Sequence, residues 1–296
     1  MPEEMRSFWT AFIASALFAY PWMRAMRVMN AVSETYAFAP ESHQSKSGTP
    51  NVGGVFVLAA ILIAAAVWIR GAFTEISIIV FGFGIIGFFD DYLIKRLTGQ
   101  RGLRWKTKLA AQIVVGLVFC VVRGFNWESA FAAFILVTFA NAYNFTDGLD
   151  GLAASLMIAA LIPFAALQSS ALAMAIIGAL LPFLVINAPP AKCFMGDVGA
   201  LPLGALFGWV LLSSPWKTEL WPWPPAAIFL IELVLVPVQI LAVKTIKRKI
   251  FPATPIHHSF ELMGWPETRI VAAFVAAQIV LGAISLSLIA DWSAKR

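Results

Sequence analysis

The sequence predicts an all-α integral membrane protein with about ten transmembrane helices, folded as a single domain over residues 1–296. Three observations predict this class. Of the 296 residues, 60% are hydrophobic and 12% are charged, whereas soluble domains carry about 25% charged residues. The hydrophobic residues lie in long runs, and a run of about 18 residues is long enough to cross the hydrocarbon core as a helix. The polar motifs fall between these runs, so no separate soluble domain is expected.

Ten apolar segments account for the predicted helices. They cover residues 8–23, 52–69, 76–90, 108–122, 129–145, 151–168, 171–187, 198–214, 225–243 and 270–290. The first segment is interpreted as a membrane helix and not as a cleaved signal peptide, because the sequence MPEEMR before it is more acidic than basic. Segments 151–168 and 171–187 must form a tight hairpin, because only Ser169 and Ser170 separate them.

The basic residues predict the orientation of the chain. It carries 21 Lys and Arg residues and a net charge of +5, and most of the basic residues lie in alternate loops. Because Lys and Arg are enriched in cytoplasmic loops, this pattern predicts both termini outside. Orientation therefore explains the positive charge, and no nucleic-acid partner is expected.

Every unusual polar stretch falls on the predicted inner side of the membrane. The stretches are SKSGTPNVGG (45–54), FFDDYLIKR (88–96), NAYNFTDGLDGL (141–152), CFMGDVGALPLG (193–204) and TPIHHSFELMGW (254–265). Ionisable groups are costly in a membrane protein, and where they gather the first interpretation is functional. The sequence therefore predicts an active site on the cytosolic face.

Asp90 and Asp91 close one apolar segment. Two adjacent carboxylates repel one another and resist burial unless a cation or a hydrogen-bond donor lies nearby. The pair is therefore a candidate for binding or catalysis. The alternative is that both residues mark an exposed helix end.

Four polar residues lie within the stretch 141–152. Asp147 and Asp150 are three residues apart, so both would face the same side of a helix that begins here. The start of a helix favours anions, and capping accounts for one of the two carboxylates. It does not account for both together with Asn141 and Asn144, which favours a ligand site.

Asp197 lies between glycines at the start of another apolar segment. A carboxylate in this position can hold Mg²⁺ through one or two oxygens, while phosphates and waters complete the octahedron. Phe194 precedes it by three residues and can stack on a nucleobase or simply pack.

His257 and His258 are two of the three histidines in the chain. The oxygen-rich residues around them favour Mg²⁺ over a transition metal, so the two imidazoles are expected to donate hydrogen bonds to phosphate or to transfer a proton. The alternative is a solvated loop. Lys46 lies in a stretch without the spacing of a Walker motif, but it can still pair with phosphate as a point charge.

Together these residues predict phosphoryl chemistry on a lipid substrate. The chain resembles the polyprenyl-phosphate N-acetylhexosamine-1-phosphate transferases, and within them it is most similar to the phospho-N-acetylmuramoyl-pentapeptide transferases. The matching stretches are ESHQSKSGTPNVGG (41–54), GFGIIGFFDDY (82–92), NAYNFTDGLDGLA (141–153), AKCFMGDVGALPLG (191–204) and PIHHSFELMGWPE (255–267). They are spread over residues 41–267, so the resemblance extends over most of the chain.

The resemblance implies a reaction and a location. UDP-N-acetylmuramoyl-pentapeptide and undecaprenyl phosphate would react, with Mg²⁺, to give UMP and lipid I for peptidoglycan synthesis. The protein would lie in the bacterial cytoplasmic membrane, and a homodimer is the assembly that the family implies.

The resemblance also implies a role for each candidate residue. Asp197 would be the Mg²⁺ ligand, and Asp90 and Asp91 would lie at the diphosphate and the lipid phosphate. His257 would be the essential histidine, with His258 beside it at the substrate. The remaining candidates would bind the nucleotide: Asp150 and Phe194 at the uracil, and Lys46, Asn141, Asn144 and Asp147 along the pocket.

The sequence departs from the family pattern at several positions. Ser259 stands where the family has a third consecutive histidine. Ala200 replaces a serine, Asn51 replaces a threonine, and Ile94 stands at a position that is often basic, with Lys95 beside it.

Three other functions remain open at this point. A related enzyme could transfer GlcNAc-1-phosphate to a polyprenyl phosphate. A pseudoenzyme could bind the lipid phosphate without turnover. A cation-coupled transporter would need charged groups near mid-span, where Glu232 and Gln239 are the main polar residues. For the transferase, sequence does not choose between direct attack by the lipid phosphate, with Asp90 orienting it, and a covalent phospho-aspartate.

Overall fold

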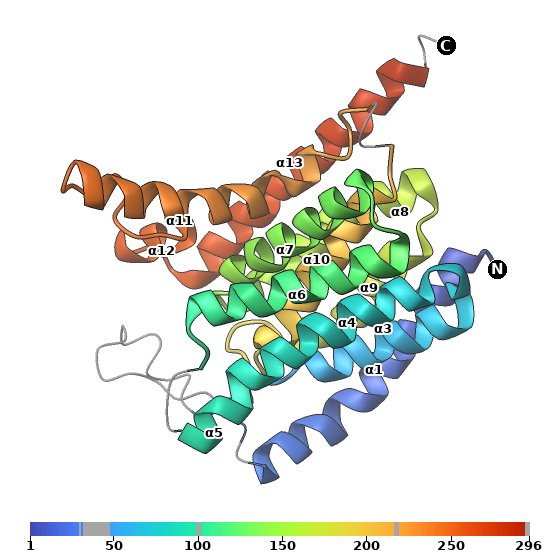
Figure 1. Ribbon diagram of the computed structural model, residues 1–296, viewed down its shortest axis with the longest axis horizontal. Coiled ribbons are helices and arrows are strands. Elements are labelled where there is room, and N and C mark those ends of the chain that lie inside the picture. The colour runs from blue at the N-terminus through green and yellow to red at the C-terminus, as the bar shows by residue number, and fades with distance from the viewer. Residues whose placement is uncertain (30, 32–47, 99–101, 216–218, 294–296) are drawn as a thin grey trace.

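The computed structural model describes residues 1–29, 31, 48–98, 102–215 and 219–293, and in these residues the regular elements are all helices (Figure 1). The α-helices are α1 (Glu3–Val28), α3 (Gly54–Trp68), α4 (Phe73–Phe88), α5 (Ile94–Thr98), α6 (Trp105–Arg123), α7 (Trp127–Thr146), α8 (Leu152–Gln168), α9 (Ala171–Asn187), α10 (Asp197–Leu212), α11 (Ala227–Thr245), α12 (Ile256–Leu262) and α13 (Glu267–Ser293). Two short 3-10 helices are η1 (Arg70–Ala72) and η3 (Pro224–Ala226), and η2 (Phe89–Leu93) is a π-helical turn.

Each predicted apolar segment coincides with one of these helices, which confirms the all-α class. The prediction of ten spans is not confirmed. Among the described residues, five helices are long and apolar enough to cross a membrane: Arg70–Leu93, Trp105–Arg123, Trp127–Thr146, Pro224–Thr245 and Glu267–Ile289. Four further apolar helices, α3, α8, α9 and α10, are shorter.

The predicted hairpin between α8 and α9 is present. Ser169 adopts a left-handed conformation with φ of 48° and ends α8. The Ser170 side chain then accepts a hydrogen bond of 3.3 Å from the Ala173 amide and begins α9. Such a cap satisfies one of the free amides at a helix start.

The α10 helix forms the centre of the bundle. Each of its residues from Val198 to Leu211 is buried, and the helix packs against α7 and α4. Gly87 of α4 allows close approach, because a Cβ atom there would lie 2.3 Å from the Asp197 carbonyl oxygen. Asp197, the first residue of α10, is thereby fixed at a contact between helices.

The C-terminal helices pack on one side of this bundle. In Figure 1, α11 and α13 diverge from each other, with α12 beneath α11. α11 packs against α7, and α13 packs against α8. In the same view α1 begins and α13 ends on the right, whereas α5 and α12 lie on the left.

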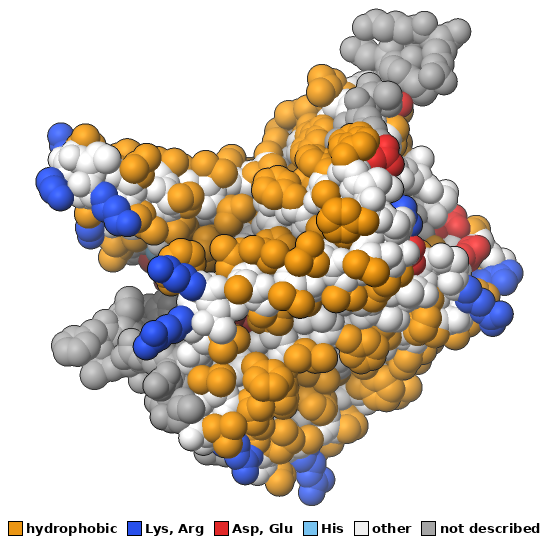
Figure 2. Space-filling view, viewed as in Figure 1, with side chains coloured by type: hydrophobic (Ala, Val, Ile, Leu, Met, Phe, Trp, Pro, Cys, Tyr) orange, Lys and Arg blue, Asp and Glu red, His pale blue; other side chains and the backbone are white. Residues whose placement is uncertain are grey.

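The surface agrees with a membrane environment. Figure 2 shows a broad band of hydrophobic side chains along the helices, and most of the Lys and Arg side chains on this face gather near the helix ends. This distribution places the apolar belt where lipid would contact the protein. The side of the membrane on which each terminus and the polar cluster lie stays a prediction.

Candidate active site

A π-helical turn at the end of α4 carries Asp90 and Asp91. π-helical turns are rare and are often found at functional sites. Adjacent residues on a helix point in different directions, and the two carboxylates have different partners. Oδ1 of Asp90 accepts a hydrogen bond of 2.5 Å from the Leu103 amide, and Oδ2 of Asp91 accepts one of 3.0 Å from the Val198 amide, in the first turn of α10.

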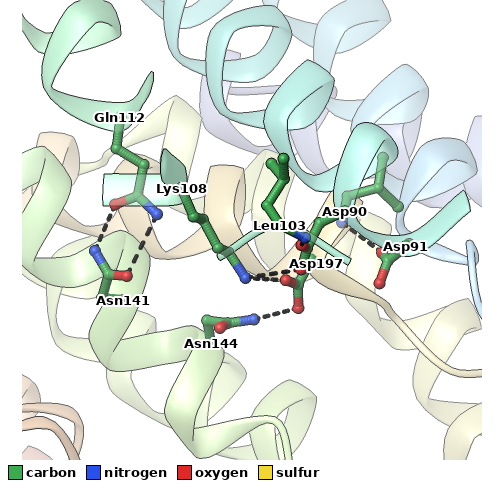
Figure 3. A network of polar contacts seen from close by, with 9 residues as sticks. Asp90, Asp91, Leu103, Lys108, Gln112, Asn141, Asn144 and Asp197 are labelled. Carbon is green, nitrogen blue, oxygen red and sulfur yellow. Dashed lines mark hydrogen bonds and ion pairs between the residues drawn. The ribbon is translucent and has the colours of Figure 1, made fainter. Parts of the chain in front are cut away.

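Lys108 of α6 joins two of the predicted carboxylates (Figure 3). Its Nζ atom lies 3.2 Å from Oδ2 of Asp90 and contacts Oδ2 of Asp197 still more closely. All three side chains are at most 20% exposed. Two ionised carboxylates this close repel one another unless a positive charge offsets them, and the ammonium group supplies that charge here.

One asparagine of α7 extends this network, and a second forms a separate pair beside it (Figure 3). Nδ2 of Asn144 donates a hydrogen bond of 2.7 Å to Oδ1 of Asp197. One turn earlier, Asn141 exchanges hydrogen bonds of 2.5 and 3.3 Å with the buried Gln112 of α6. Residues from α4, α6, α7 and α10 therefore meet in one network, although they are far apart in the sequence.

The turn between α7 and α8 carries Asp147 and Asp150. Burial, followed by the Asp197 and Asp150 carboxylates, raises the pKa of Asp147 to about 7. Asp150 is 4% exposed, and its Oδ2 atom accepts a hydrogen bond of 2.9 Å from the Ala191 amide. Asp150 thus holds the connection before α10, and its role at uracil stays a prediction.

Phe194 lies in that connection, against the residues that precede α3. The Phe194 amide donates to the Pro50 carbonyl at 2.8 Å, and the Gly53 amide donates to the Phe194 carbonyl at 2.9 Å. The described part of the stretch 45–54 is therefore paired to the stretch 193–204. Lys46 lies outside the described residues.

His257 is fully buried, in the first turn of α12. Its Nδ1 atom lies 3.2 Å from Oε1 of Glu232 on α11. A Cβ atom at Gly148 would lie 2.3 Å from its Nε2 atom, so the ring meets the turn that carries Asp147. His258 is partly exposed, and its Nδ1 atom lies 2.5 Å from Oε2 of Glu261.

Several of these carboxylates can hold a divalent cation. Asp90 and Asp197 already share one ammonium group, and the described residues contain no group of three or more His, Cys, Asp or Glu side chains in metal-binding geometry. Two carboxylates fit Mg²⁺, which is usually bound by one or two carboxylates with phosphates and waters. They do not fit an ion held by protein ligands alone.

Comparison with known proteins connects this arrangement to a family. The Glycosyl transferase family 4 model matches residues 73–214. The chain is 36% identical over 299 residues to the phospho-N-acetylmuramoyl-pentapeptide-transferase of Bacillus subtilis (strain 168), with 90% of each chain covered. It is 33% identical over 325 residues to the protein of the same name from Geobacillus thermodenitrificans (strain NG80-2), with 97% of this chain and 98% of the relative covered.

The chain belongs to the phospho-N-acetylmuramoyl-pentapeptide-transferase family. Membership in this transferase family, together with the long apolar helices, identifies a multi-pass membrane protein. The matched stretch 73–214 contains the Lys108 network. It ends before Glu232 and His257. The matches to the two relatives cover 90% and 97% of this chain and therefore include both residues.

The Ser259 departure from the family pattern has a structural explanation. Its hydroxyl donates to the Ala253 carbonyl at 2.6 Å and accepts from the Ala253 amide at 3.0 Å. The side chain therefore holds the connection to α12 by both hydrogen bonds. Ala200 is fully buried within α10.

Sequence reasoning missed Lys108, Gln112 and Glu232. In the sequence, Lys108 is only one of 21 basic residues, whose pattern predicts orientation, and Glu232 is only a polar residue within a predicted span. The adjacent carboxylates required a cation or a hydrogen-bond donor nearby, so a partner for Asp90 could be expected, but its identity depends on how α6 packs. Glu232 and Gln239 both bond within the protein, which leaves the transporter alternative without its main residues.

Proposed function

We propose that the protein transfers phospho-N-acetylmuramoyl-pentapeptide from its UDP donor to undecaprenyl phosphate, giving lipid I and UMP in peptidoglycan synthesis. The observation that carries the proposal is the Lys108 network. It joins Asp90, Asp197 and Asn144 in a chain whose relatives bear the name of this transferase.

The reaction has to bring two anions together. An oxygen of the lipid phosphate attacks the phosphorus linked to the sugar, the phosphoanhydride bond breaks, and UMP leaves with the bond's electrons. Much of the lipid phosphate is already dianionic at neutral pH, because its second pKa lies near 6. Catalysis of phosphoryl transfer is therefore mainly a matter of positioning and charge stabilisation.

The residues of the network divide this task. The Lys108 ammonium offers positive charge to phosphate oxygens, as a point charge does in other phosphate sites. The Leu103 amide fixes one oxygen of Asp90, so that the other can orient the attacking phosphate. Asn144 donates to Oδ1 of Asp197. The other oxygen, Oδ2, faces the Lys108 ammonium group.

We propose Mg²⁺ as the cofactor, held by Asp197 next to Asp90. When bound, it would neutralise the charge that develops on the diphosphate, which is worth several kcal/mol in enzymes of this kind. The proposal also includes the roles that the resemblance implies for the other residues. Asp91 would lie at the diphosphate or the lipid phosphate and His258 at the substrate, and the nucleotide would be bound by Lys46, Asp147, Asp150 and Phe194.

The membrane arrangement belongs to the same proposal. Ten spans with both termini outside would place the network on the cytosolic face of the bacterial cytoplasmic membrane, where the soluble donor is made. A homodimer is expected from the family. Cysteine labelling of residues near Arg6 and Lys247 in intact cells would test the orientation, since only the former should react with an impermeant reagent.

The function is tested with purified protein in detergent, Mg²⁺ and undecaprenyl phosphate. We expect UMP release from UDP-N-acetylmuramoyl-pentapeptide, and none without the lipid. Release only from UDP-GlcNAc would identify the related GlcNAc-1-phosphate transferase. No release from either donor, by protein with a cooperative thermal transition, would favour the lipid-binding pseudoenzyme.

The covalent route is tested with the donor alone. Direct attack leaves the protein unmodified, because the lipid phosphate is the nucleophile. Intact-protein mass spectrometry should therefore find no added phosphosugar after incubation without lipid. An adduct on Asp90 or Asp91 would establish the phospho-aspartate route instead.

A further inference from the structure

Glu232 is a carboxylate buried on an apolar helix. It lies on α11 within the candidate span Pro224–Thr245, and its side chain is 0% exposed. A buried carboxylate is costly unless it is paired and hydrogen-bonded. Here Oε1 lies 3.2 Å from Nδ1 of His257, and Oε2 accepts a hydrogen bond of 2.7 Å from the Ile256 amide.

With Glu232 ionised, these two contacts place a proton on Nδ1 of the His257 ring. An ionised carboxylate only accepts hydrogen bonds, and the Ile256 amide already donates to one of its oxygens. The other oxygen then requires a proton on Nδ1. A carboxylate that holds one ring nitrogen in this way sets both the tautomer and the orientation of a histidine.

The opposite nitrogen is directed at the turn between α7 and α8. Nε2 of His257 is buried and makes no hydrogen bond within the described residues. Buried polar atoms are nearly always paired, so an unpaired one calls for an explanation. Nε2 lies against Gly148, the residue after Asp147. Both residues belong to the turn between α7 and α8, and Asp147 interacts electrostatically with Asp197 of the Lys108 network.

We infer that Glu232 is a positioning residue that acts through His257, holding Nδ1 protonated so that Nε2 is the atom presented to a phosphate oxygen of the substrate. This inference rests on the proposed function. A neutral ring accepts a hydrogen bond at Nε2 only from a protonated phosphate oxygen, and an imidazolium ring donates one there to an ionised phosphate oxygen. In both states Nδ1 carries a proton, which is what Glu232 secures.

Gln239 shows what a purely structural role for Glu232 would look like, because both side chains accept hydrogen bonds from backbone amides of the same connection. The connection between α11 and α12 runs back along α11 and is held at two points. Gln239 accepts hydrogen bonds from the Ile250 and Phe251 amides at 3.0 and 3.1 Å. Glu232 holds Ile256 in the same way, but it alone of the two contacts the histidine.

This pair provides matched variants. In Glu232→Gln the side chain has nearly the same size, but one of the two acceptor oxygens becomes an NH2 donor, so the Ile256 amide and Nδ1–H no longer each have an acceptor oxygen of their own. We expect kcat to fall about 10- to 100-fold, the usual effect of removing the group that orients a functional histidine, with little change in KM. Gln239→Ala weakens the connection itself and is expected to lower Tm with a much smaller effect on kcat.

The tautomer can be read without any substrate. The chain has three histidines, so the ¹⁵N spectrum of histidine-labelled protein is simple, and a His257→Asn variant assigns the signals. We expect His257 to be protonated at Nδ1 in the wild type and in Gln239→Ala, and to lose this preference in Glu232→Gln. A neutral wild-type ring protonated at Nε2 instead would overturn the inference, even if Glu232→Gln fails to fold.

A double variant tests whether Glu232 acts through the histidine. Glu232→Gln should cause no further loss of kcat in a His257→Asn background, and an additive loss would mean an independent role. Wild-type UMP release is measured first. Its absence would count against the proposed function, whereas an altered tautomer would count only against the role of Glu232.

Discussion

Nε2 of His257 lies so close to Gly148 that a Cβ atom on this glycine would be 2.3 Å from it. No real Cβ contact is this short, so an alanine must displace either the ring or the turn. We predict that Gly148→Ala lowers kcat about 10-fold or more, because a small misplacement of a reacting group is costly. Gly71→Ala is the control, since nothing lies within 4 Å of a Cβ atom there. Equal rates for the two variants would contradict this account of His257.

Lys108 is predicted to stabilise the fold as well as the substrate. Lys108→Met leaves Asp90 and Asp197 without the cation that they share, which should lower the free energy of unfolding by about 1–3 kcal/mol. Thermal unfolding measures the effect, with Lys106→Met, at an exposed neighbour, as the control.

Magnesium should then raise Tm more in Lys108→Met than in the wild type. The reason is that Mg²⁺ replaces the missing positive charge between the carboxylates. If Mg²⁺ changes Tm equally in both proteins, the cation does not bind at this pair of aspartates.

The pKa of Asp147 predicts a pH dependence of stability. Its folded-state value of about 7 lies above the ordinary value of 3.8, so the folded protein holds a proton that the unfolded chain has lost. The free energy of unfolding should therefore fall as pH rises from about 4 to about 7 and then level off. Asp147→Asn removes this ionisation, and without Mg²⁺ it should raise Tm at pH 8 but not at pH 4. A gain of the same size at both pH values would show that the charge is not the cause.

The sequence was sufficient to predict the helices and the stretches that gather between them. The apolar runs predicted the long helices, and Ser169 and Ser170 predicted the hairpin between α8 and α9. Both predictions depend only on residues that are close together in the sequence. Candidate carboxylates could be chosen because charged groups are rare in such a chain. The close contacts among the stretches 88–96, 141–152, 193–204 and 254–265 follow from packing, and only their common side was predictable.

The partners of these residues could not be predicted from the sequence. The π-helical turn directs Asp90 to Lys108 and Asp91 to the start of α10. Two adjacent aspartates in a sequence do not show that their partners differ. Glu232 and His257 are brought together by the path of the chain after α11. In both cases the decisive contact joins residues that are distant along the chain, and no local pattern encodes it.

The most direct test of the central claim is formation of the lipid-linked product by wild-type protein and by Asp197→Asn. Labelled UDP-N-acetylmuramoyl-pentapeptide is incubated with undecaprenyl phosphate and Mg²⁺, and label extracted with the lipid is counted. We predict label in the lipid fraction for the wild type and a loss of about 100-fold or more in the variant, with the fold retained, as judged from a cooperative thermal transition. Lipid labelling by the variant at the wild-type rate would contradict the assignment of Asp197 and of the network around it.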